Sequence, residues 1–181
     1  MPRLKPVDPV TAIGKAKELL DRVQGKLGVV PNMTRVMATL QVVLESYLNF
    51  SGALVGGLFD ANTREKLAPL TAQENSCDYR LSAHTAIDKM VGLKEEEIVT
   101  DPHDNGNNPK TTAALTFAKQ VLDTKGQISE AELAAVRNAG FFDGEIAEII
   151  AHVALNIFTN YLNVATDMDI DFPKMSYAEV A

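Results

Sequence analysis

The chain has 181 residues, of which 46% are hydrophobic and 23% are charged, and its formal net charge is −7. This composition is ordinary for a globular protein and excludes a largely disordered chain, so we expect one domain over residues 1–181. The acidic balance, with no segment that concentrates Lys and Arg together with aromatic residues, argues against nucleic acid as a partner.

The N-terminal segment, MPRLKPVDPVTAIGKAKELL, has charges and prolines where a secretory signal needs a continuous apolar stretch. No segment reaches the roughly 18 apolar residues that a membrane span requires. The single cysteine, Cys77, cannot form an internal disulfide, which is typical of a reducing compartment. Together these features predict a cytoplasmic protein that does not associate with membranes.

The first helical pattern runs from residue 12 to about residue 25, with Thr11 available as its N-cap. Residues 28–32, with the sequence GVVPN, interrupt this pattern because proline lacks a backbone N–H. The next helix is expected to open at the proline or the asparagine of this turn. Residues 33–54 then have apolar helical spacing, which fits either one long helix or two short ones.

A further helix is expected to begin at a cap, Asp60 or Asn62, and to end at a turn formed by residues 75–76. Another helix should follow from about Cys77 to residue 90. Residues 93–108 contain EEE and then DPHDNGNNP, which predicts a short amphipathic helix followed by a polar loop.

Three helical patterns complete the chain, over residues 111–124, 129–138 and 143–166, and Pro173 closes the last. The second of them begins with the capping-box sequence SEAE. No stretch shows the sustained apolar and polar alternation of half-buried strands. The sequence therefore predicts an all-α fold of about seven or eight helices.

The segment around Cys77 gathers reactive side chains. In a helix, residues three, four and seven apart share a face, so Cys77, Arg80 and His84 should converge. Cys77 also falls at the expected helix start, where unpaired amides and the helix dipole favour a thiolate, and Arg80 acts in the same direction. Glu65 precedes Cys77 by twelve residues on the preceding helix, so a short turn would bring its carboxylate close enough to orient or charge His84.

These residue types can work together as a catalytic set. A thiolate attacks, a histidine moves the proton, and a carboxylate sets the pKa and tautomer of the histidine. The same spacing also fits a cysteine that is buried as a small hydrophobic residue, which is the commoner role of a single cysteine in a cytosolic protein. The residues alone leave both roles open.

Glu65, followed by NSCDYRLSAHT over residues 75–85, resembles the signature of the carboxymuconolactone decarboxylase and alkylhydroperoxidase D family, a Glu and then Cys-x-x-Cys-x-x-x-His. The GVVPN turn and residues 141–143, 156–163 and 171–173 look like further parts of that family. The resemblance implies an all-helical, alkylhydroperoxidase D-like bundle that assembles as a homo-oligomer, a trimer or a hexamer. It also implies that Glu65 and His84 form a proton relay and that Cys77 is the first cysteine of the signature.

Arg80 occupies the position of the second cysteine of the family, so a disulfide cycle between two cysteines is impossible in this chain. Tyr79 lies between the two cysteine positions, where some members have a histidine that joins the relay. Its side chain could donate a hydrogen bond or serve only in packing.

Three functions remain open. The first is a single-cysteine peroxidase, in which Cys77 is oxidised to a sulfenate by an organic hydroperoxide and reduced by an external thiol. The second is a decarboxylase-like enzyme, in which Arg80 and His84 hold and protonate a small acidic lactone. The third is a catalytically degenerate scaffold, in which Arg80 only pairs with Glu65 or Asp78 and fills the former pocket. We carry the antioxidant peroxidase forward as the prediction, with these candidate catalytic residues: Cys77, His84, Glu65, Arg80 and Tyr79.

Other candidates have simpler interpretations. Glu148 and His152 lie one helical turn apart and could ligate a metal, but no second pair lies nearby in the sequence, so we expect a role at the helix surface or the core edge. The segment around His103 lacks the alternating oxygen ligands of a calcium loop and predicts a solvated turn. Three asparagines of the last helix predict a polar seam where helices or subunits meet: Asn156, Asn160 and Asn163.

An apolar stripe between Met33 and Tyr47 could line a hydroperoxide pocket, but such stripes are usually core, and core is the prediction here. No Gly-rich phosphate loop, haem motif or thiolate cluster is present in the sequence. The sequence therefore implies no organic or metal cofactor, and the electrons for a peroxidase would come from a partner thiol.

Overall fold

The computed structural model describes residues 2–80, 82–83, 86 and 108–174, and within these ranges it contains helices and no strand. The predicted all-α fold class is confirmed. Seven helices have defined bounds: α1 (Gly14–Leu27), α2 (Asn32–Met37), α3 (Gln41–Val55), α4 (Ala61–Glu74), α6 (Pro109–Thr124), α7 (Glu130–Asn138) and α8 (Asp143–Thr166).

Residues 78–80, 82–83 and 86 are also helical, in agreement with the helix expected after Cys77. The rest of that helix, the loop predicted before residue 108 and His103 lie outside the described residues. None of the helices that the structure describes has the length and apolar character needed to cross a membrane.

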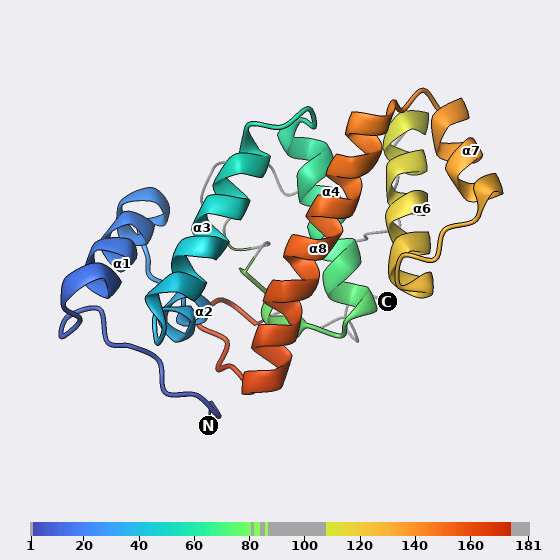
Figure 1. Ribbon diagram of the computed structural model, residues 1–181. Helices are drawn as coiled ribbons and strands as arrows, with labels where there is room; N and C mark the ends of the chain where they lie inside the picture. Colours follow the sequence, from blue (N-terminus) through green and yellow to red (C-terminus); the bar gives the residue numbers. More distant parts are fainter. Residues whose placement is uncertain (1, 81, 84–85, 87–107, 175–181) are drawn as a thin grey trace.

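The longest helix, α8, is the central element of the fold (Figure 1). It packs against α4, α3, α6 and α2, while α1 lies beyond α3 and α7 lies beyond α6. The chain therefore has an N-terminal side built from α1 to α3 and an opposite side built from α6 and α7, with α4 and α8 between them.

Apolar side chains form two buried clusters that follow this division. One joins α4, α6, α7 and α8 and includes Leu67, Phe117 and Ile149. The other joins α1, α2 and α3 to the segment after α4, and it includes Cys77 and Tyr79. The candidate nucleophile is thus a member of the N-terminal core.

Local capping chemistry fixes several helix starts where the sequence predicted them. Asp60 accepts the backbone N–H of Thr63 at 2.8 Å, so Asp60 is the cap of α4. The capping box of α7 is formed between Ser129 and Glu132, whose side chain accepts the Ser129 N–H at 2.8 Å. The bounds of α8 are those predicted.

The start of α1 differs from the prediction. The helix begins at Gly14, with Ile13 rather than Thr11 at the N-cap position. Gly14 has a φ of +59°, a left-handed conformation that prevents a regular helical turn from extending back toward Thr11. Ile13, inside the predicted helical pattern, consequently lies outside the helix and is 84% exposed.

The apolar stretch after the GVVPN turn forms two helices, α2 and α3, rather than one. Met33, Met37 and Leu44 from the predicted stripe are buried, as expected of core. Leu40 lies in the short break between the helices and is 54% exposed, because the turn there rotates it away from the shared face.

Candidate functional site

The turn between α4 and the next helical segment positions Cys77. Ser76 adopts a φ of +50°, which reverses the chain after α4. The Cys77 N–H then donates to the carbonyl of Ala72 at 2.9 Å, and the Cys77 carbonyl accepts the N–H of Arg80 at 3.1 Å. Cys77 therefore lies at the junction of two helical segments, directly before helical residues 78–80, as the sequence predicted.

The sulfur of Cys77 is enclosed by protein, with the residue only 1% exposed. The Nδ2 amide of Asn163, on α8, lies 4.0 Å from the Cys77 sulfur and 3.6 Å from the sulfur of Met33. Burial raises the pKa of the Cys77 thiol, although the Arg80 backbone amide, the Arg80 charge and the Asn163 amide act in the opposite direction. The predicted effects of the helix start and Arg80 are present, but burial outweighs them and the resting thiol is protonated.

Tyr79 links the Cys77 segment to two distant parts of the chain. Its hydroxyl donates to the Asp171 carboxylate at 2.7 Å and accepts the backbone N–H of Met33 at 3.2 Å. Its ring meets Phe172 edge to face at 6.0 Å. Burial, assisted by the Asp171 carboxylate, raises the pKa of Tyr79 far above its ordinary value, so the hydroxyl stays protonated. In this arrangement Tyr79 donates a hydrogen bond and also holds the wall beside Cys77.

Arg80 lies on the next position of the same segment and points toward α8. Its Nη2 is 3.4 Å from the Asn156 side-chain oxygen, and the Asn156 amide in turn donates to the carbonyl of His152 at 2.9 Å. The guanidinium is half-buried and also lines a pocket described below. Arg80 is therefore placed between the polar face of α8 and open space.

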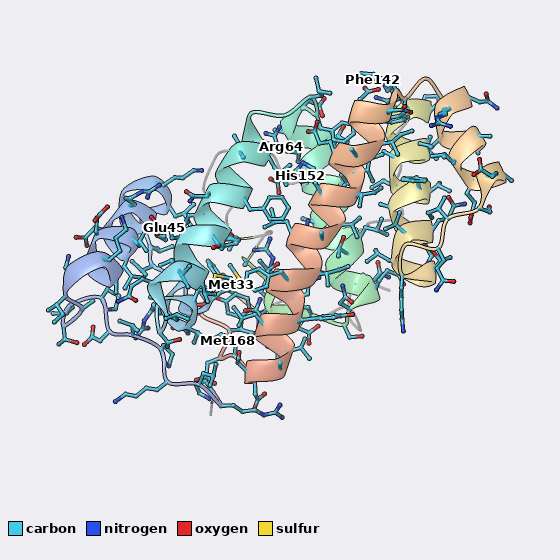
Figure 2. The ribbon with its side chains drawn as sticks, viewed as in Figure 1. Met33, Glu45, Arg64, Phe142, His152 and Met168 are labelled. Carbon is cyan, nitrogen blue, oxygen red and sulfur yellow. The ribbon has the colours of Figure 1, made fainter. Side chains whose placement is uncertain are left out.

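Glu65 is half-buried on α4, and its charge acts on the buried imidazole of His152. Figure 2 shows His152 beside Arg64, where α3, α4 and α8 meet. His84 lies outside the described residues, so its predicted contacts with Glu65 and Cys77 stay predictions. Among the described residues, the structure thus places the histidine His152 in the surroundings of Glu65.

The Glu148 and His152 pair is buried rather than at the helix surface. Glu148 accepts the backbone N–H groups of Leu58 and Phe59 at 2.7 and 3.1 Å, and its Oε1 lies 3.8 Å from His152 Nε2. Burial lowers the pKa of His152, and the nearby Arg64 adds to this effect while Glu148 and Glu65 oppose it. No group of three or more His, Cys, Asp or Glu side chains within the described ranges is placed to hold a metal.

The predicted polar seam runs along the buried face of α8. Asn156, Asn160 and Asn163 are all buried within this chain, so the seam lies between helices. Three side-chain atoms of this seam have no hydrogen-bond partner among the residues that the structure describes. They are the Oδ1 and Nδ2 of Asn160 and the Oδ1 of Asn163. Buried polar atoms without partners are rare in folded proteins and often accompany functional sites.

A pocket of about 240 Å³ opens between α1, α3 and the segment after Cys77. Its lining includes Met33 and Tyr79, which also pack in the cluster around Cys77, and three basic side chains: Arg22, Lys26 and Arg80. Cys77 itself lies behind this wall. The sequence did not point to Arg22 or Lys26, because nothing in a helical pattern tells which of its polar positions will border a cavity.

No family model matches the sequence, and no curated protein matches it. Solved structures do match. A protein from Ralstonia eutropha JMP134, described as an alkylhydroperoxidase AhpD core and an uncharacterized peroxidase-related protein, superposes with a TM-score of 0.81 at 23% identity, over 94% of this chain and 92% of that one. An uncharacterized peroxidase-related protein from Silicibacter sp. TM1040 gives a TM-score of 0.73 at 26% identity, over 99% of this chain and 91% of that one.

The chain has the alkylhydroperoxidase AhpD-like fold. A further neighbour of this fold is the debrominase Bmp8, solved as a cysteine-to-alanine variant in complex with 2,3,4-tribromopyrrole, with a TM-score of 0.78 at 16% identity over 93% of this chain and 91% of that one. Proteins of the AhpD-like fold therefore differ in their chemistry.

Proposed function

We propose that the protein is a thiol-dependent peroxidase, in which Cys77 reduces a small organic hydroperoxide. The observation that carries the proposal is the placement of Cys77 at a helix start, with the Asn163 amide directed at its sulfur, in a fold shared with peroxidase-related proteins. Asn163 favours the thiolate over the thiol, which is what a nucleophile requires.

Activation must remove a proton from a buried thiol. Because burial keeps the Cys77 thiol protonated, a base has to take its proton as the substrate arrives. The resemblance in sequence assigns this role to His84, with Glu65 as its partner. The thiolate then attacks the outer oxygen of the hydroperoxide, so an S–O bond forms while the O–O bond breaks. Sulfur is oxidised by two electrons to a sulfenic acid, and the alkoxide takes the transferred proton and leaves as an alcohol.

Arg80 replaces the second cysteine of the sequence signature, so the return half of the cycle requires external thiols. A first thiol attacks the sulfenic sulfur and releases water, which leaves a mixed disulfide on Cys77. A second thiol attacks that disulfide, restores the Cys77 thiol and leaves with the first as a free disulfide. The two electrons gained by the hydroperoxide are thus supplied by two partner thiols.

Access to the sulfur depends on the wall between Cys77 and the pocket. Met33 contributes to this wall and shares the Asn163 amide with Cys77. A methionine side chain has three rotatable bonds and adapts readily to a new neighbour. We infer that the Met33 side chain moves aside when a hydroperoxide reaches Cys77.

The basic pocket supports a second candidate, a carboxymuconolactone decarboxylase-like enzyme that acts on a small acidic lactone. Arg22, Lys26 and Arg80 would neutralise the acid, and Cys77 would not be needed. A catalytically degenerate scaffold is the third candidate. Reactivity of Cys77 separates the peroxidase from both.

We also propose that the chain forms a homo-oligomer, a trimer or a hexamer. Large apolar side chains are exposed one helical turn apart on α8, at Phe158 and Tyr161. Exposed apolar side chains that lie together are typical of protein interfaces. Light scattering on the purified protein tests this proposal, and a monomer at micromolar concentration would contradict it.

The peroxidase proposal is tested by adding cumene hydroperoxide to the reduced protein and trapping the sulfenic acid with dimedone. We expect one dimedone adduct per chain on Cys77, none with Cys77→Ser, and a much slower reaction with His84→Ala. Turnover with an added dithiol should follow. A Cys77 thiol that reacts no faster than free cysteine would exclude the peroxidase and leave the lactone enzyme or the degenerate scaffold.

A further inference from the structure

The pocket beside Cys77 has a charge opposite to that of the whole chain. The protein has 24 acidic and 17 basic residues, yet the described residues that line this pocket include Arg22, Lys26 and Arg80 and no Asp or Glu. A local positive potential in an acidic protein concentrates anions at that place.

Two of these cations, Arg22 and Lys26, are not engaged by any described residue and are placed to bind an anionic ligand. Arg22 and Lys26 lie one helical turn apart on α1, and neither makes a hydrogen bond or an ion pair with any residue that the structure describes. Other lysines of the same helix are paired: Lys15 with Glu18 and Lys17 with Asp21. Counting only the part of the chain that the structure describes, the cations of α1 that border the pocket are thus the ones without carboxylate partners.

The rest of the pocket suits the apolar body of an organic molecule. Val23, Leu48 and Phe172 contribute apolar walls, and the hydroxyls of Tyr47 and Ser51 have no hydrogen-bond partner among the described residues. The volume of about 240 Å³ is below the range of roughly 300–1,000 Å³ that holds drug-sized ligands. The site therefore fits a small molecule that is apolar along its length and anionic at one end.

We propose that this pocket binds the substrate as a small organic carboxylate, with the carboxylate held by Arg22 and Lys26 of α1 and the opposite end directed toward Met33 and Tyr79. The identity of the reacting end, a hydroperoxide, rests on the proposed function, whereas the recognition of the carboxylate does not. Charge-assisted hydrogen bonds from Arg and Lys are about twice as strong as neutral ones, which makes the carboxylate the main determinant of specificity. The expected substrate is then a hydroperoxide that carries a carboxylate, such as the para-carboxylate of cumene hydroperoxide.

The test measures binding apart from catalysis. Para-isopropylbenzoate and its neutral amide are titrated into the full-length protein by calorimetry, at low and at physiological ionic strength. We expect the affinity for the acid to exceed that for the amide by about tenfold or more, because the difference between the two ligands is electrostatic. For the same reason, added salt should lower only the affinity for the acid. Equal affinity for acid and amide would overturn the proposal.

Matched variants locate the contact. Arg22→Gln and Lys26→Gln should each lower the affinity for the acid by about threefold to tenfold and leave the affinity for the amide unchanged. Lys17→Gln removes the same charge from the same helix at a position outside the pocket. The affinity of this variant for the acid should stay within about twofold of that of the unsubstituted protein. If Lys17→Gln weakens the acid as much as the other two variants do, recognition by the pocket is excluded.

Reactivity then separates this inference from the proposed function. If the acid binds as expected but neither cumene hydroperoxide nor its para-carboxylate oxidises Cys77, the carboxylate pocket stands and the peroxidase proposal fails. If Cys77 consumes both hydroperoxides at equal rates and the acid binds no better than the amide, the peroxidase stands and the carboxylate pocket is overturned.

Discussion

The side-chain amide of Asn163 lies 4.0 Å from the sulfur of Cys77 and joins α8 to the segment that follows α4. The two residues are 86 positions apart in the chain. Both are buried, so water does not compete for this contact. An N–H directed at sulfur stabilises the thiolate more than the thiol, because the thiolate carries the charge. Asn163 thus partly offsets the cost of ionising a buried cysteine.

Replacement of Asn163 by leucine removes this donor while keeping similar bulk. We expect the pKa of Cys77, already raised by burial, to rise further in Asn163→Leu. Since one pKa unit changes the thiolate fraction tenfold, alkylation by iodoacetamide at pH 8 should slow by about threefold or more. The measurement is the rate of Cys77 alkylation as a function of pH.

Asn160→Leu is the matched control, because Asn160 is equally buried on α8 but makes no hydrogen bond to Cys77. Its alkylation profile should follow that of the unsubstituted protein. An Asn163→Leu profile that is unchanged, or that shifts no more than the Asn160→Leu profile, would show that the contact has no electrostatic effect on the thiol.

The hydroxyl of Tyr79 is expected to stabilise the fold. Tyr79→Phe leaves the buried N–H of Met33 without its acceptor and removes one of the two donors to the Asp171 carboxylate, which still accepts the backbone N–H of Asn32. An unsatisfied buried group costs about 1–3 kcal/mol, so the free energy of unfolding should fall by about that amount. Urea denaturation measures this free energy. The control is Tyr161→Phe, at a residue that is 59% exposed, which should change the free energy of unfolding by less than about 0.5 kcal/mol. Equal effects of the two substitutions would contradict the structural role of Tyr79.

Local sequence signals predicted the helices well, whereas the environment of the site depended on tertiary packing. The cap at Asp60, the capping box at Ser129 and the turn before Cys77 are read from neighbouring residues, and the structure contains all three. The burial of Cys77 could not be read in this way, because it depends on side chains from α2 and α8 that are remote in sequence. Proximity to Arg80 therefore suggested that Cys77 is a thiolate. Desolvation, which the sequence does not reveal, instead raises the pKa of Cys77 and favours the thiol.

The same limit applies to a feature of α8. Glu148 resembled half of a metal site, but its carboxylate accepts two backbone N–H groups from the turn between α3 and α4. Its partners lie about ninety positions earlier in the chain, beyond the reach of a local pattern.

Gly57 is required at that turn because of its contact with Glu148. A Cβ at position 57 would overlap the Glu148 carboxylate, which cannot retreat without losing its hydrogen bonds to Leu58 and Phe59. We expect Gly57→Ala to destabilise the protein by about 1–3 kcal/mol. Gly25→Ala, inside α1 and with open space around the new Cβ, should instead stabilise it by about 0.5–1 kcal/mol. Urea denaturation of both variants decides, and a Gly57→Ala protein as stable as Gly25→Ala would refute this role of Glu148.

The buried imidazole of His152 should make the stability of the protein depend on pH. Burial and Arg64 lower the pKa of His152 against the opposing charges of Glu148 and Glu65, so the unfolded chain binds a proton more readily than the folded one. Stability is then complete above the unfolded value of about 6.5 and is lost as the pH falls from there toward the lowered folded pKa. In His152→Leu this proton linkage is absent. As the pH falls from 7.5 to about 5.5, the unsubstituted protein should therefore lose unfolding free energy relative to His152→Leu. Urea midpoints measured across that range test this, and a difference that stays constant with pH would mean that the pKa of His152 is the same in the folded and unfolded states.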